Sequence, residues 1–360
     1  MANVRGSRSG REKSSEVLAY EAGISHASAL RILRRNNIHN VKPTTKCGLT
    51  DEMRAARLKF CLDHQDWDLE RWKDVIFSDE TAVVLGHRRG AVRLWRAPDE
   101  GLEKTVIRER WKGYTEFMFW GCFSYDRKGP CHIWKQQTVA QKKKDDLDLA
   151  EVNTLLEPIA KAEWELSTGV RRINLRRNPG GKKPQWRWNE ANGKLIRKGK
   201  GGVDFWRHYK EIMIPKFIPF AKECQKSRPS TLIQEDGAPA HKHHHQATVY
   251  ALHDVVRLTW PGNSPDLNAT EPGWWWMKRR TTARGAPKTR KEMEQAWLKA
   301  WNEELSQEQI QRWIERIPIH IQEIIALEGG NEYEEGRKYF KRSFAGLRVK
   351  GKLSKHTYLS

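Results

Sequence analysis

Acidic residues at the ends of apolar runs limit most strongly how this chain can fold. Asp79 closes an apolar run at 75–77, Asp236 closes another at 232–234, and Glu271 follows a turn-rich loop. Apolar runs of this length predict buried strands, and strands deliver such carboxylates to one end of a sheet. Carboxylates from separate elements suit Mg²⁺, which takes oxygen ligands at about 2.1 Å. Two ions held there can assist an in-line phosphoryl displacement.

Composition favours a folded protein with a polyanionic partner. The chain has 360 residues, enough for about two to three domains. Lys and Arg exceed Asp and Glu by 21, which makes nucleic acid the first candidate partner. The 17 Trp argue against disorder. We find no apolar run of the roughly 20 residues that a membrane span requires, and we expect no membrane partner.

Two short helices are expected near the start of the chain, over Ser15–Ala22 and His26–Asn36, with Ser25 as the N-cap of the second. Ala19 and Gly23 are expected to let the helices approach closely. This is the outline of a helix-turn-helix, whose second helix enters the major groove of DNA. Three arginines lie on its outer face and are candidate DNA contacts: Arg31, Arg34 and Arg35. An ordinary helical hairpin with a solvated basic face fits the pattern equally well.

The pattern of apolar residues predicts strands in the middle of the chain and helices in its last third. Apolar runs at 74–85, 91–95, 117–123 and 131–134 are separated by turns, which indicates an antiparallel start to a sheet. Helical patterns follow at 145–165 and 205–224. Apolar residues at helical spacing between 293 and 317 are expected to form core.

Two segments are strongly basic. Residues 171–202 hold eleven Lys or Arg and one acid, with Trp186 and Trp188 among them. Such a segment suits a phosphate backbone with stacked bases, and Arg187 and Lys198 are its candidate contacts. A solvated hairpin whose tryptophans pack locally is the alternative. The segment 336–360 has eight Lys or Arg and no acid, a pattern that binds nucleic acid or serves nuclear import, so a nuclear location is expected.

Four blocks of sequence resemble a known family in the same order. They are WKDVIFSDET at 72–81, WGCF at 120–123, QEDGAPAH at 234–241 and WPGNSPDLNATE at 260–271. In these blocks the chain resembles the DDE transposases of the Tc/mariner superfamily. Thirty-four residues separate Asp236 from Glu271, a spacing similar to that of the branch whose third acid is Glu.

The resemblance implies an α/β fold. A ribonuclease-H-like catalytic domain, with a mixed central sheet and flanking helices, is expected over residues 49–330, with a basic insertion at about 136–204. A small all-α helix-turn-helix region and linker at 1–48 would precede it. A basic C-terminal tail at 331–360 would follow.

The resemblance also implies an activity. Asp79, Asp236 and Glu271 would be catalytic residues that bind two Mg²⁺ or Mn²⁺ ions, and a homodimer would cut double-stranded DNA at transposon terminal repeats. The freed ends would be joined to target DNA, typically at TA. His241 matches a family position near the active site, where it would orient a scissile phosphate or a water ligand of the metal. The alternative interpretation is an ordinary buried histidine. No phosphate-binding loop is found, so no nucleotide cofactor is expected.

The chain departs from the family pattern at its start. Family members carry two helix-turn-helix units, whereas only the second is recognisable here. Three arginines precede this helix-turn-helix unit and would be what remains of a segment that binds the minor groove of DNA: Arg5, Arg8 and Arg11. The alternative hypothesis is therefore an inactive or domesticated transposon-derived protein that only binds DNA. A tract of histidines at 241–245 is expected to bind a soft metal at most adventitiously.

Overall fold

The computed structural model describes residues 13–36, 38, 46–84, 116–174, 184–197, 202–283, 285, 287, 289–333 and 335. They fall into two units, Met1–Cys47 and Gly48–Ser360, and each unit is described by itself. Within the described ranges, none of the helices has the length and apolar character needed to cross a membrane.

The first unit contains two helices, α3 (Ser15–Glu21) and α4 (His26–Arg35). The hydroxyl oxygen of Ser25 accepts a hydrogen bond from the backbone N–H of Ser28 at 3.2 Å, which confirms the predicted N-cap. Gly23 was expected to permit close helix packing, but no described atom lies within 4 Å of where its Cβ would stand. Its φ of +63° supplies the reason for glycine, because other residues are strained in this left-handed turn.

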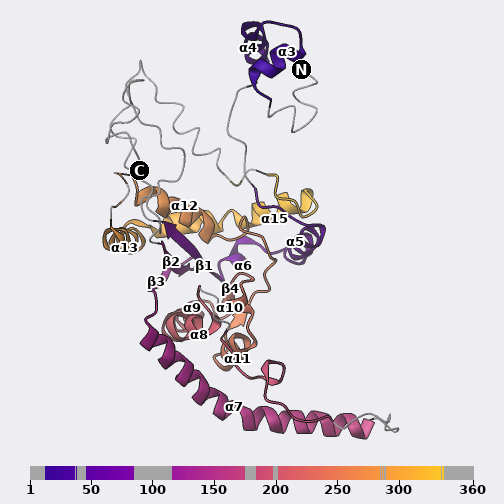
Figure 1. The fold of residues 1–360 in the computed structure, drawn as a ribbon, viewed down its shortest axis with the longest axis vertical. Coiled ribbons are helices and arrows are strands. Elements are labelled where there is room, and N and C mark those ends of the chain that lie inside the picture. Colours follow the sequence, from indigo (N-terminus) through magenta and orange to yellow (C-terminus); the bar gives the residue numbers. More distant parts are fainter. Residues whose placement is uncertain are drawn as a thin grey trace. The chain divides into compact units, whose positions relative to one another are not determined.

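A five-stranded sheet in the order β3-β2-β1-β4-β5 forms the centre of the second unit (Figure 1). Its strands are β1 (Val75–Val84), β2 (Glu116–Phe123), β3 (Lys128–Ile133), β4 (Leu232–Gln234) and β5 (Val256–Arg257). The first three strands pair antiparallel, as predicted, whereas β4 pairs parallel with both β1 and β5. The sheet is therefore mixed.

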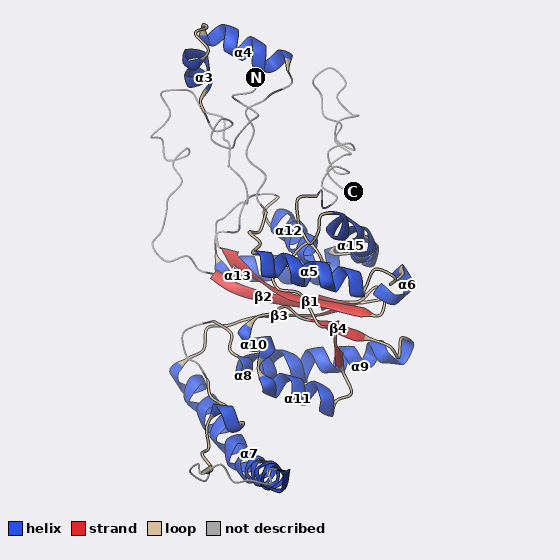
Figure 2. Ribbon diagram, turned by 90° about the vertical axis from the view of Figure 1, so that its right-hand side faces the viewer, coloured by secondary structure: helices blue, strands red, loops and turns tan. Residues whose placement is uncertain are grey.

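Helices cover both faces of the sheet (Figure 2). On one face lie α5 (Asp51–Asp63), α6 (Leu69–Trp72), α12 (Thr270–Arg280), α13 (Arg290–Lys299), η4 (Ala300–Glu304), α14 (Gln307–Ile314) and α15 (Ile317–Ala326). On the other lie α8 (Phe205–His208), the π-helical η3 (Tyr209–Phe217), α9 (Ile218–Ser227), α10 (Pro239–Lys242) and α11 (His244–Leu252). Each face buries its own hydrophobic cluster.

The core of the first face is rich in tryptophan. Trp297 and Trp301 are buried against the sheet, as their spacing predicted. The ring of Trp301 fills the space above Gly121 of β2, where a Cβ would come within 2.6 Å of it. The glycine of the WGCF block is therefore needed for this close approach.

The basic insertion is organised around a long helix, α7 (Val139–Asn174), which is longer at both ends than the helix predicted at 145–165. The hydroxyl of Thr138 accepts a hydrogen bond from the N–H of Gln141 and so starts the helix early. After the helix, Trp186 packs on Trp164 of α7, with ring centroids 5.7 Å apart, and stacks on Trp188. These contacts support local packing of the tryptophans. A short 3₁₀ turn, η2 (Glu190–Asn192), follows.

One buried ion pair ties the loop 260–268 to the rest of the second unit. Arg57 of α5 and Asp266 of the loop form two parallel hydrogen bonds, both 2.7 Å long. Arg57 also donates to the carbonyl oxygen of Gly329, and the hydroxyl of Tyr333 donates to Asp266. Burial alone would raise the pKa of Asp266, but the bonds from Arg57 and Tyr333 hold that pKa below its ordinary value.

We predict that Arg57→Leu lowers the free energy of unfolding by about 3–5 kcal/mol, because it leaves the Asp266 carboxylate buried without its partner. Urea denaturation of the purified chain measures this change. Arg312→Leu is the matched control, since Arg312 and its partner Glu308 are both largely exposed, and it should change stability little. Equal effects of the two substitutions would contradict the prediction.

Candidate functional site

The candidate site lies where β1 and β4 run side by side. The two strands are in parallel register, with Phe77 opposite Gln234. Asp79 and Asp236 each follow these paired positions by two residues, so both acids emerge at the same end of the pairing. The hydroxyl of Ser78 donates to the carbonyl oxygen of Gln234 at 2.7 Å and fixes the two strands together immediately before the acids.

Asp79 points to the sheet face that α12 covers. Its Oδ2 accepts a hydrogen bond of 3.0 Å from the indole N–H of Trp274 and lies 3.4 Å from the hydroxyl of Thr270. Both partners belong to α12. The first turn of this helix therefore holds one oxygen of the Asp79 carboxylate in place.

Glu271 is in the first turn of α12, as predicted. The side-chain oxygen of Asn268 accepts from the N–H of Thr270 at 3.1 Å, and the carbonyl oxygen of Asn268 accepts from the N–H of Glu271 at 3.2 Å. These bonds complete the start of the helix. Glu271 is exposed and close enough to Asp79 for their charges to repel.

The electrostatics of Asp79 are unusual for an aspartate. Burial raises its pKa to about 8, and the neighbouring charges of Glu80 and Glu271 add to the rise, while the Trp274 hydrogen bond opposes it. A carboxyl group in these surroundings ionises readily only when positive charge is brought near it. The donor set of Asp79 and Glu271 consists of carboxylate oxygens, which fits Mg²⁺ or Mn²⁺.

Asp236 is held by a histidine. Nδ1 of His241 lies 2.7 Å from Oδ1 of Asp236, and the N–H of Ala238 donates to the same oxygen at 2.9 Å. Burial alone would raise the pKa of Asp236, but the contacts with His241 and Ala238 bring that pKa below its ordinary value. Nε2 of His241 in turn lies 3.4 Å from Oε1 of Glu80, the neighbour of Asp79 on β1. His241 thus links the two strands.

Some site residues were not assigned from the sequence. Glu80 lies within a quoted block, and the alternation of side chains along a strand places it on the face opposite Asp79. Trp274 stands three residues after Glu271, a spacing that puts both on one side of a helix. These two periodicities are the signals that would have pointed to them.

Only some of the predicted DNA contacts lie within the described residues. Arg31, Arg34 and Arg35 are exposed on α4, and Arg187 is exposed in the segment 184–197. The remaining candidates lie outside the described residues: Arg5, Arg8, Arg11 and Lys198. Their role as DNA contacts stays a prediction.

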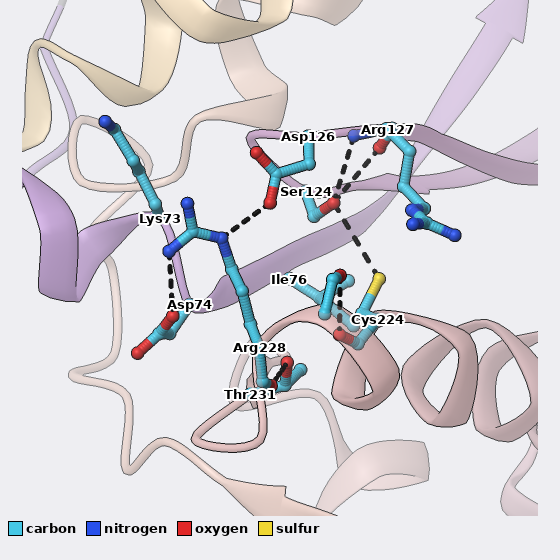
Figure 3. A pocket seen from close by; sticks show the side chains of 10 residues that line it. Lys73, Asp74, Ile76, Ser124, Asp126, Arg127, Cys224, Arg228 and Thr231 are labelled. Carbon is cyan, nitrogen blue, oxygen red and sulfur yellow. Dashed lines mark hydrogen bonds and ion pairs between the residues drawn. The ribbon is translucent and has the colours of Figure 1, made fainter.

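A separate pocket lies at the start of β1, beside Ile76 (Figure 3). Arg228 crosses it and forms ion pairs with Asp74 and Asp126. The other two cations of its lining, Lys73 and Arg127, pair with Glu70 and Glu223, so this pocket is a structural ion-pair cluster rather than the candidate site.

Comparison with known proteins identifies transposases as relatives. The chain is 27% identical over 314 residues to the Tcb1 transposase of Caenorhabditis briggsae, covering 85% of this chain and 86% of that protein. It is 21% identical over 309 residues to the Tc1 transposase of Caenorhabditis elegans, with 85% and 86% covered. No protein-family model matches the chain.

Solved structures share the fold. The Mos1 mariner paired end complex with Mn superposes with a TM-score of 0.59 at 14% identity, covering 90% of this chain and 76% of that chain. The Mos1 strand transfer complex gives a TM-score of 0.57 at 15% identity, with the same coverage. A mixed sheet with helices on both faces is the ribonuclease-H-like class that was predicted. Relatives and structures together confirm the resemblance to the Tc/mariner superfamily of transposases.

We predict that Asp79 makes the metal-free protein less stable, relative to Asp79→Asn, as pH rises from about 4 to about 8. The unfolded chain ionises Asp79 near its ordinary pKa of 3.8, whereas the folded chain holds the proton until about pH 8. At Asp79 the folded state binds one proton more over this range, so the contribution of this residue to the free energy of unfolding falls by up to about 1.4 kcal/mol per pH unit. Urea denaturation in a chelator at several pH values measures the slope.

Asp79→Asn should flatten this slope. Asp236→Asn is the control. The pKa of Asp236 is lower in the folded chain than in the unfolded chain. Its contribution to stability is therefore present above the unfolded-state pKa and is lost only as pH falls through the folded-state pKa. It should therefore leave the fall between pH 4 and 8 in place. The same slope in wild type and Asp79→Asn would contradict the prediction.

Proposed function

We propose that this chain is a DNA transposase that cuts DNA at transposon ends and joins those ends to target DNA, as a homodimer and preferentially at TA. The observation that carries the proposal is the pair Asp79 and Glu271, two carboxylates that repel each other at one end of a ribonuclease-H-like sheet beside Asp236. Such a site favours divalent cations. The relatives are transposases, and the structures of similar fold include complexes with transposon ends.

We propose that Asp79, Asp236 and Glu271 hold two Mg²⁺ or Mn²⁺ ions. When bound, these ions supply positive charge to the attacking and leaving oxygens of the phosphoryl transfer. The protein's own groups set the geometry. Trp274 fixes one oxygen of Asp79, and His241 fixes one oxygen of Asp236.

DNA would be attracted by the net charge of +21 and bound by the first unit. Ala19 and Ala29 are buried between α3 and α4, which leaves the arginines of α4 on the outer surface. This arrangement suits a recognition helix with phosphate contacts. The exposed Arg187 offers a further contact from the second unit.

We predict that Asp236→Asn lowers Mg²⁺-dependent nicking of a duplex carrying a transposon end by at least about 100-fold, because the remaining carboxylates cannot hold both cations in place. Binding to the same duplex should be unchanged or tighter, since one negative charge is lost near the phosphates. Gel assays of nicking and binding measure the two effects.

Asp254→Asn is the matched control for nicking. Asp254 lies in the turn after α11, where it is exposed, and its substitution should leave cutting intact. Equal nicking by wild type and Asp236→Asn would overturn the proposed site. DNA binding with no nicking under any divalent cation would instead support a protein that only binds DNA.

We predict that replacing Arg31, Arg34 and Arg35 by Gln flattens the salt dependence of DNA binding. The logarithmic slope should fall by about 0.9 for each phosphate contact removed. Filter binding at several salt concentrations measures the slope. Arg312→Gln, an exposed arginine on α14, is the control and should leave the slope unchanged. An unchanged slope in the triple variant would show that α4 does not bind phosphates.

A further inference from the structure

A second polar cluster lies on the sheet face opposite Asp79. It is formed by Glu80 of β1, His208 of α8 and His241 of α10. One ligand atom from each residue lies within 4.8 Å of the other two. The three residues come from elements far apart in sequence, and none of them is one of the three acids proposed to hold Mg²⁺.

His208 needs a partner that the described residues do not supply. Its side chain is fully buried, and neither ring nitrogen forms a hydrogen bond within the described part of the chain. Its Nε2 lies 3.4 Å from Glu235, and its ring centroid lies 4.6 Å from that of His241. Burying a polar group without a hydrogen bond costs free energy. A neutral imidazole nitrogen can coordinate a metal ion, so a bound ion would supply the missing partner.

One distance in the cluster is that of two ligands on a shared ion, and the remaining ligand atoms lie within 4.8 Å. Nε2 of His241 and Oε1 of Glu80 are 3.4 Å apart, which is longer than the 2.7–2.9 Å of a charge-assisted hydrogen bond. It is the separation expected of two ligands on one tetrahedral zinc ion, where bonds of about 2.0–2.1 Å give ligand pairs about 3.3–3.4 Å apart. The other nitrogen of His241 is bound to Asp236 at 2.7 Å. Carboxylates orient zinc-bound histidines in this manner.

Charged groups of both signs surround the cluster. Glu80, Glu235 and Asp236 are all carboxylates, and the nearest arginine is Arg257, whose Nε lies 3.6 Å from Glu235. Arg257 also donates to the carbonyl oxygen of His241 at 3.0 Å. His241, whose pKa these carboxylates raise well above its ordinary value, and Lys242 also bring positive charge beside them, so a divalent ion would bind by displacing the proton of His241.

We propose that Glu80, His208 and His241 form a zinc site. Two imidazole ligands favour zinc over Mg²⁺, which prefers oxygen ligands. The ion would join β1, α8 and α10, and through His241 it would hold Asp236 in position. None of the three ligands is one of the acids proposed to bind the catalytic cations, and the contact of His241 with Asp236 joins the two sites.

The test uses the purified full chain, stripped with a chelator and titrated with Zn²⁺ against a chromophoric competitor. We expect one tightly bound Zn²⁺ per chain and a rise in melting temperature when it binds. His208→Gln should weaken zinc binding by more than about 100-fold, since loss of a ligand costs more than loss of an outer hydrogen-bond partner. Circular dichroism without metal checks that the variant folds. Glu80→Gln, at a less buried position, gives the same test if His208→Gln does not fold.

Two controls separate this site from others. Asp254→Asn should leave zinc affinity unchanged, because Asp254 is exposed in the turn after α11 and is not part of the cluster. His244→Ala removes an exposed histidine of the 241–245 tract and should also leave it unchanged. The proposal is overturned if wild type binds Zn²⁺ no more tightly than His208→Gln and Glu80→Gln. It is likewise overturned if His244→Ala abolishes binding, which would assign the metal to the surface tract.

Discussion

The parallel pairing of β1 with β4 is the constraint on which the rest of the structure depends. Three register pairs, from Val75 with Leu232 to Phe77 with Gln234, join segments more than 150 residues apart. Parallel strands cannot be joined by a tight turn, so the chain between them supplies two further strands, a long helix and part of the cover of one sheet face. The two acids that follow the pairing come together only because this register is kept. The Ser78 hydroxyl bond to Gln234 holds it at the last pair.

Alternation along β1 gives one strand two chemical roles. Asp79 faces α12, where Trp274 binds it and Glu271 repels it. Glu80 faces the opposite side, where it meets His241. Because His241 also binds Asp236, the two faces are coupled through the end of the sheet. A change on either face therefore acts on the carboxylates proposed to hold the catalytic cations.

Much of the fold could be predicted from local patterns. Short stretches of sequence predict the N-cap at Ser25, the strand that carries Asp79 and the helix that opens near Glu271, since capping and strand alternation involve neighbours only. The full length of α7 was missed because the cap at Thr138 lies before the stretch judged helical. The role of Gly23 was misjudged because close packing and a left-handed turn both select glycine. Local sequence does not distinguish the two.

The sequence by itself determined the kinds of group at the site: carboxylates placed after apolar runs, a histidine five residues beyond Asp236, and an excess of positive charge for DNA. Only the tertiary structure decided which groups meet. The raised pKa of Asp79 depends on its burial beneath α12, and the proximity of His208 to Glu80 and His241 depends on how α8 packs against the sheet. Desolvation and Coulomb interactions act through space over a few ångströms, and separation along the chain carries no information about such distances.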